Sequence, residues 1–132
     1  MKNPFEIGAI KMYEKEVTKD EVASFETGNV HPFYATFSLA RDAEWGGRLF
    51  VLEMKDDDEE GIGTFLSIKH KSPAGLGDLV RIETTLVKVL SNKITCSFVA
   101  CVDSRIIATG ETGQMILKKS QVQAMIKDID VR

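Results

Sequence analysis

Residues 36–54 read TFSLARDAEWGGRLFVLEM, and this stretch decides the fold. Its apolar residues recur at helical spacing and form one stripe, made of Leu39, Ala40, Ala43, Gly47, Phe50, Val51 and Met54. At ~1.5 Å per residue, a helix over this stretch would be about 28 Å long. So long a helix needs a broad surface on which to bury its stripe, and a sheet is such a surface.

The segments after this helix alternate between apolar and polar residues, which predicts four strands. They cover residues 62–70, 80–86, 94–102 and 106–117, and turn-forming residues separate them. A further strand is predicted over 9–17, before the helix, and the tail 121–131 has apolar residues at helical spacing. His31 precedes Pro32, so we interpret it as a loop residue without a functional role.

One long helix between an N-terminal strand and an antiparallel meander predicts an α+β fold, in a single domain over residues 1–132. In this architecture an antiparallel sheet wraps around one long helix, as in the hot-dog fold. A cystatin-like sheet with one helix is the alternative, although it would place its helix closer to the N-terminus.

Charge and composition exclude several classes of function. Lys and Arg number 17 against 20 Asp and Glu, and this mildly acidic balance argues against binding to a nucleic-acid backbone. No run of about 20 apolar residues is present, so we expect no membrane partner. The first residues, MKNPFEIGAIKMYEKEV, lack the apolar core of a signal peptide. We therefore expect a cytoplasmic protein.

The residues that bind metals do not occur at metal-binding spacings. Cys96 and Cys101 lie in one predicted strand on opposite faces, so we expect free thiols, and zinc-type spacing is absent. The acidic run 55–61 lacks the spacing of an EF-hand loop and is interpreted as a solvated loop that ends the helix. We expect neither a metal nor a cofactor.

Four residues interrupt the apolar surfaces and are candidates for chemistry: Thr36, Glu44, Gly63 and His70. Glu44 lies at the edge of the buried stripe, where it could be partly desolvated, or it could form an exposed pair with Arg48. His70 is either a satisfied core residue or a group that titrates near neutrality. Thr36 either caps the helix or lies where free amides could bind an oxyanion. Gly63 marks either a bulge or a close approach to the backbone.

The intervals between these residues resemble those of the hot-dog thioesterases of the fluoroacetyl-CoA thioesterase type. In that family a Thr is followed by a Glu eight residues later and by a His twenty-six residues after the Glu, as in Thr36, Glu44 and His70. Gly63 keeps the family's place seven residues before the His. The resemblance covers roughly residues 15–118.

Two residues depart from the fluoroacetyl-selective relatives. Gln114 stands where those relatives have a basic residue, and Val30 stands where they have an aromatic lid. The resemblance therefore does not imply fluoroacetate resistance, and it leaves the acyl group open. The His-Gly-Gly motif of another hot-dog thioesterase branch is absent, because Trp45 precedes the two glycines.

The resemblance implies that the protein hydrolyses a small acyl-CoA thioester to a free acid and CoA. Glu44 would be the general base or the nucleophile, and His70 would hold the water or protonate the thiolate. Thr36 would orient Glu44 or the substrate, and Gly63 N–H would bind the oxyanion. A non-catalytic hot-dog protein that binds acyl-CoA or another ligand is the alternative, and a structural protein of cystatin-like fold is a third.

The helix imposes a geometric condition on this site. Eight residues of continuous helix would separate Thr36 from Glu44 by about 12 Å, too far for their side chains to touch. Either the regular helix begins after Thr36, or the site combines residues of two protomers. Since hot-dog proteins resemble one another in dimerising through their sheets, we expect a homodimer or a higher homo-oligomer.

Overall fold

The computed structural model describes residues 1–131; residue 132 of the predicted domain lies outside the described residues. A short 3₁₀ helix, Lys19–Glu21, lies between the first two strands. In chain order, the strands and helices are β1 (Ile10–Glu16), β2 (Val22–Phe25), β3 (Gly28–Tyr34), α1 (Thr36–Met54), β4 (Glu59–His70), β5 (Leu79–Leu90), β6 (Lys93–Val102), β7 (Arg105–Lys118) and α2 (Lys119–Val131).

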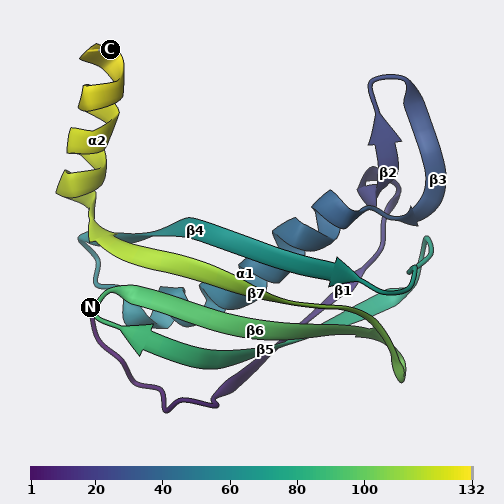
Figure 1. Ribbon diagram of the computed structural model, residues 1–132, viewed down its shortest axis with the longest axis horizontal. Coiled ribbons are helices and arrows are strands. Elements are labelled where there is room, and N and C mark those ends of the chain that lie inside the picture. Colours follow the sequence, from purple (N-terminus) through teal and green to yellow (C-terminus); the bar gives the residue numbers. More distant parts are fainter. Residues whose placement is uncertain (132) are drawn as a thin grey trace.

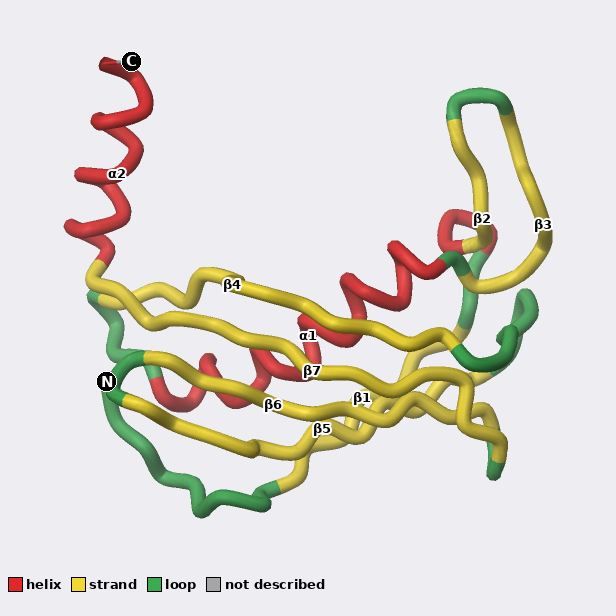
Figure 2. Tube along the Cα trace, in the orientation of Figure 1, coloured by secondary structure: helices red, strands yellow, loops and turns green. Residues whose placement is uncertain are grey.

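Five antiparallel strands form a sheet that curves around α1, which confirms the expected α+β architecture (Figure 1). The strand order is β1-β5-β6-β7-β4, so β4 pairs with β7 and not with β5, which follows it in the chain. This placement makes β4 an edge strand. The strands β2 and β3 form a separate hairpin beyond the N-terminal end of α1, while α2 projects from the opposite end of the sheet (Figure 2).

Helix α1 has the bounds that its apolar stripe predicts, because that stripe faces the sheet along its whole length. Leu39, Phe50 and Met54 are fully buried, and each such side chain contributes about 1.5–3 kcal/mol to folding. Gly46 and Gly47 let the helix approach β5 and β7 closely. A Cβ atom at Gly47 would come within 2.6 Å of Thr112 Oγ1, and one at Gly46 within 2.5 Å of Thr84 Oγ1.

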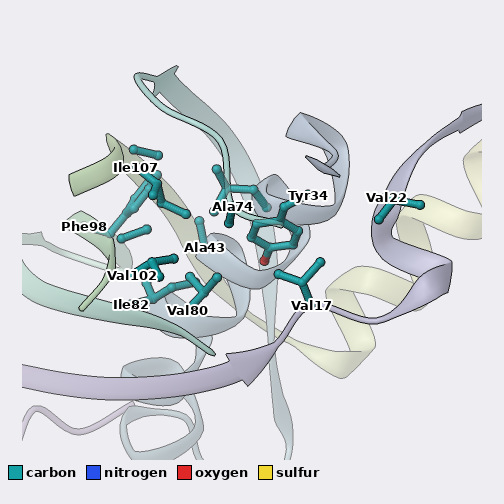
Figure 3. Close-up of a cluster of buried hydrophobic side chains, with 13 residues drawn as sticks. Val17, Val22, Tyr34, Ala43, Ala74, Val80, Ile82, Phe98, Val102 and Ile107 are labelled. Carbon is teal, nitrogen blue, oxygen red and sulfur yellow. The ribbon is translucent and has the colours of Figure 1, made fainter. Parts of the chain in front are cut away.

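The core forms two clusters along the helix. The first lies under its N-terminal half and joins the sheet to the base of the β2–β3 hairpin. Figure 3 shows Tyr34, the last residue of β3, and Val17, which follows β1, in one cluster with Ala43. The second lies under the C-terminal half, around Phe50 and Leu86. The predicted alternation of β5 and β6 is confirmed, since the even-numbered residues from 80 to 86 and from 94 to 102 are buried.

The two cysteines lie in β6 and are both free thiols, as expected. Cys96 faces the core and is buried, whereas Cys101 is half-buried. Burial raises the pKa of the Cys96 thiol to about 12.

The structure corrects two interpretations of the sequence. His31 does not lie in a loop, because His31 and Pro32 are part of β3. A two-stranded hairpin tolerates the proline, which needs only an edge position without a ladder hydrogen bond. The acidic run is also not wholly a solvated loop. Glu59 already belongs to β4 and is buried, with its carboxylate 3.8 Å from Lys118 Nζ.

Candidate active site

The side chains of Thr36 and His70 meet at the N-terminal end of α1. Thr36 is the first residue of the helix, and His70 is the last residue of β4. Thr36 Oγ1 lies 3.1 Å from His70 Nδ1, a hydrogen-bonding distance. The residue at the N-cap position is Ala35, and no side chain caps the helix there. The Thr36 hydroxyl is therefore committed to the imidazole and not to the first free amides of α1.

The second ring nitrogen of His70 has no partner. Nε2 is buried and makes no hydrogen bond with the described residues. Burial lowers the pKa of His70 below 6.5, and the nearby backbone of Ser72 only partly offsets this effect. The imidazole is thus mainly neutral at pH 7, with Nδ1 in contact with Thr36 and Nε2 buried without a partner among the described residues.

The Glu44 carboxylate lies against the backbone of β4 at Gly63. A Cβ atom at position 63 would overlap with Glu44 Oε1, so only glycine leaves room for the carboxylate there. The pairing of β4 with β7 also shifts its register between Gly63 and Phe65. Both interpretations of Gly63 therefore apply, since it lies at an irregularity in the strand and is closely approached by a side chain.

Arg48 does not pair with Glu44, so the exposed helical ion pair considered from the sequence is wrong. The Arg48 guanidinium donates to Glu60 Oε1 at 2.8 Å and to the carbonyl oxygen of Gly61 at 3.5 Å. Glu44 itself is exposed in the single chain, not partly desolvated as its position in the stripe suggested. A small cavity of about 230 Å³ beside it is lined by Arg48, Trp45 and Gln114.

These two pairs do not meet within one chain. Helix α1 is regular from Thr36 onward, so the possibility that it begins later is excluded. Eight residues of helix separate the two side chains by ~12 Å along the axis. Thr36 and His70 line one cavity, whereas Glu44 and Gly63 line another, and no residue is shared between the two linings.

The β2–β3 hairpin lies beside the Thr36–His70 pair and forms one wall of the cavity that this pair lines, which has a volume of about 480 Å³. Its walls include Phe25 and Phe33 from the hairpin and Phe37 from α1. No pattern in the sequence marks these aromatic residues as part of a site. The signal available was the position of Phe33 and Phe37 on either side of Thr36 in the chain.

A buried polar network fixes the base of that hairpin. The Tyr34 hydroxyl donates to Asp42, and both side chains are almost wholly buried, at 1% and 3% exposure for the two residues. Burial and the Asp42 carboxylate raise the pKa of Tyr34, so its proton stays on the phenol. Arg41 donates to Glu21 at 2.7 Å, and Lys15 also pairs with Glu21.

Glu21 is the centre of this network. Burial alone would raise the pKa of Glu21, but hydrogen bonds from Lys15 and Thr18 outweigh it and hold that pKa below its usual value. Its backbone carbonyl also accepts the Ala35 N–H at 2.8 Å. The network therefore holds the first turn of α1, and with it Thr36, in a fixed position relative to the sheet.

Among the described residues, Asp56, Asp58 and Glu59 form a carboxylate group compact enough for a metal ion, with one oxygen of each within 4.8 Å of the others. Lys118 Nζ lies 3.0 Å from Asp58, and the Met1 amine lies 2.7 Å from Glu59. Two of the protein's own cations thus offset part of the charge of these three carboxylates. No helix within residues 1–131 combines the length and the apolarity needed to cross a bilayer.

Solved structures show the same fold. A hypothetical protein of Thermus thermophilus, a thioesterase superfamily member, shares 31% identity, with 98% of this chain and 96% of that chain covered and a TM-score of 0.93. A hot-dog-like protein from Thermanaerovibrio acidaminovorans shares 17% identity, with 94% and 92% covered and a TM-score of 0.85.

A variant of the fluoroacetyl-CoA-specific thioesterase FlK, in complex with fluoroacetate and CoA, shares 16% identity. The alignment covers 89% of this chain and 99% of that one, with a TM-score of 0.81. These likenesses confirm the hot-dog fold and set the cystatin-like alternative aside. Among curated proteins, no match is found.

The sequence itself carries the family assignment. Residues 17–120 match the family described as fluoroacetyl-CoA-specific thioesterase, and this range covers most of the chain, including both residue pairs. The chain therefore belongs to the FlK fluoroacetyl-CoA-specific thioesterase family and is a thioester hydrolase of the acyl-CoA thioesterase type.

Proposed function

We propose that this protein hydrolyses a small acyl-CoA thioester to a free acid and CoA, with Thr36, Glu44 and His70 as catalytic residues and Gly63 as a substrate-binding residue. The observation that carries this proposal is the arrangement of the four residues in two pairs. Each pair brings together one residue of α1 and one residue of β4. Each pair is therefore half of a site.

We further propose that the protein is a homodimer, formed by antiparallel pairing of two β4 edges. Within the described residues β4 has a neighbour on one side only, and it exposes Phe65 and Leu66, with Phe65 at 48%. An unpaired apolar edge is a ready template for strand pairing. In Figure 1 this edge lies open between α2 and the β2–β3 hairpin.

A two-fold axis between Leu66 and Ser67 of the paired β4 strands would set His70 opposite Gly63 of the partner subunit. It would also reverse α1 of the second protomer and lay it beside the first. The Thr36–His70 pair of one protomer would then face the Glu44–Gly63 pair of its partner. Such a dimer contains two equal sites, each completed by both chains. This resolves the 12 Å separation without any bending of the helix.

The chemistry follows from the side chains present. Glu44 removes a proton from water, and the resulting hydroxide adds to the thioester carbonyl; or Glu44 attacks the carbonyl itself and water then cleaves the anhydride. Gly63 N–H donates to the oxyanion, and one such donor contributes about 3 kcal/mol. When the tetrahedral intermediate collapses, the C–S bond breaks, and the proton that Glu44 took from water passes to His70 and from it to the thiolate of CoA. In the anhydride route, the water that cleaves the anhydride supplies this proton. Thr36 holds His70 through its Nδ1.

The remaining parts of the proposal concern the cell. We place the protein in the cytoplasm, where acyl-CoA is available, and its two free thiols agree with a reducing compartment. Its acidic net charge of −3 agrees with the absence of a nucleic-acid partner.

Mixed dimers test the composite site directly. The variants Glu44→Ala and His70→Ala should each lose thiol release from acyl-CoA. When the two are unfolded, mixed in equal amounts and refolded together, half of the dimers contain both chains, and each of these has one intact site. Activity should return to about a quarter of the wild-type value. If each site were built from one chain, the mixture would stay inactive.

A further inference from the structure

We propose that the cavity beneath the β2–β3 hairpin is the acyl-binding chamber and that, among small acyl groups, it selects branched or aryl ones over two-carbon ones. This inference rests on the proposed function, because it assigns the substrate of the same site. The chamber is the 480 Å³ cavity that Thr36 and His70 line.

The position of the chamber connects it to the reaction. Thr36 and His70 line it together with Ser72 and Pro73, which follow β4. An acyl chain whose thioester carbonyl lies beside the imidazole can therefore extend toward the hairpin. The far wall is apolar, so a hydrocarbon group gains by entering.

The walls offer aromatic surfaces to that group. Phe25 and Phe37 pack edge to face, with ring centroids 5.8 Å apart, and join the hairpin to α1. Phe25, Phe33 and Phe37 all retain large exposed areas, from 42% to 62%. Exposed phenylalanine rings around one cavity are unfavourable in water and become favourable when an apolar group covers them.

The acyl groups differ in the share of the chamber volume that they fill. An acetyl group has three heavy atoms, and at roughly 30 Å³ for each it fills about 90 Å³. That is about a fifth of the chamber volume of 480 Å³. An isovaleryl or phenylacetyl group fills two to three times as much, roughly, and reaches the phenylalanine rings. Val30 lines the chamber from the hairpin and takes up less room there than an aromatic residue would.

The first experiment compares kcat/KM for acetyl-CoA, isobutyryl-CoA, isovaleryl-CoA, phenylacetyl-CoA and succinyl-CoA. We expect the branched and aryl substrates to exceed acetyl-CoA by about tenfold or more. A preference for acetyl-CoA would overturn the inference and leave the hydrolase intact. A preference for succinyl-CoA would also overturn it, because a carboxylate paired with Lys71 would then define the chamber.

The second experiment fills the chamber. Val30→Phe adds a ring at an exposed hairpin position, so the fold should be retained. It should lower the ratio of isovaleryl to acetyl kcat/KM by about fivefold or more. Leu90→Phe is the matched control, an equally exposed apolar residue at the turn between β5 and β6, and it should leave the ratio unchanged. An unchanged ratio in Val30→Phe would refute the assignment of the chamber.

Binding separates this inference from the proposed function. Analogues with a methylene group between the sulfur and the carbonyl cannot be hydrolysed, so calorimetry with acetyl and isovaleryl forms measures the chamber alone. Tighter binding of the isovaleryl form supports the chamber even if no thioester is turned over. Equal or weaker binding refutes the chamber even if Glu44→Gln abolishes turnover, which supports the hydrolase.

Discussion

Thr36 Oγ1 lies 3.1 Å from Nδ1 of His70 and so joins the first turn of α1 to the last residue of β4. The contact orients the imidazole, whose Nε2 is buried and has no partner in the described residues. The ring is half-buried, and its desolvation lowers the pKa of His70, so the imidazole accepts a second proton less readily than in water.

His70 should make the protein sensitive to mild acid. Its folded-state pKa is below the unfolded value of 6.5, so the unfolded chain binds the proton more tightly, and stability falls as the pH drops below about 6.5. His70→Gln should flatten the dependence of the free energy of unfolding on pH between pH 7 and 5. Urea unfolding at several pH values measures it. The control Ser67→Gln, on the same strand, should keep the wild-type slope.

Gly63→Ala should reduce turnover with little loss of stability. The added methyl would occupy the place of Glu44 Oε1, and Glu44 is an exposed side chain that can move away. A displacement of about 1 Å can cost roughly 100-fold in rate. Steady-state kcat and the thermal unfolding midpoint should separate the two effects. Thr64→Ala, at the next position in the strand, serves as the control. Wild-type turnover in Gly63→Ala would show that catalysis does not depend on the close approach of Glu44 to Gly63.

Tyr34→Phe should destabilise the protein by about 1–3 kcal/mol, because it leaves the buried Asp42 carboxylate without its hydroxyl donor. Denaturant unfolding measures this change. Tyr34→Phe combined with Asp42→Leu removes both polar partners and should recover part of the loss. No recovery would show that the two side chains are energetically independent. Tyr13→Phe, a half-buried tyrosine of β1, should have little effect.

Gly47→Ala should also destabilise, even though alanine favours helix by about 1 kcal/mol. Its methyl would lie 2.6 Å from Thr112 Oγ1, and overpacking of this kind costs about 1–3 kcal/mol. Combining it with Thr112→Ala removes the obstructing hydroxyl. The double variant should then be more stable than Gly47→Ala alone in denaturant unfolding, whereas simple additivity would contradict the proposed contact.

Leu66→Lys should weaken the dimer if β4 is the interface. In an antiparallel pair of edges, the two introduced cations would lie near one another and repel. Light scattering over a range of concentrations should show monomers, and the specific activity should fall with them. Leu90→Lys places the same charge at the β5–β6 turn and should remain dimeric. If Leu66→Lys formed fully active dimers, the dimer interface would not lie at β4.

Local patterns predicted most of the fold. The apolar stripe gave α1 its bounds, and alternation identified β5 and β6. The β2–β3 hairpin was missed because Pro32 suggests a loop, and only its pairing partner makes His31 part of a strand. The place of β4 at the sheet edge was equally hidden, since the pairing of β4 with β7 joins residues far apart in the chain.

The sequence predicts which residues form the candidate site but not how the fold arranges them. The resemblance selected Thr36, Glu44, Gly63 and His70, and the 12 Å rise already indicated that one chain could not unite Thr36 with Glu44. Sequence patterns could not show that Arg48 prefers Glu60, because that contact depends on where β4 begins. They also could not show the chamber, whose walls come from the unpredicted hairpin.

The burial of Cys96 has a consequence for an enzyme whose product is itself a thiol. Mixed disulfides form through the thiolate, and a pKa of about 12 leaves roughly one Cys96 side chain in 10⁵ ionised at pH 7. Oxidised CoA that accumulates around the protein would therefore not be attacked by this side chain. The sheet that shapes the reaction site therefore also keeps the Cys96 sulfur from forming such adducts.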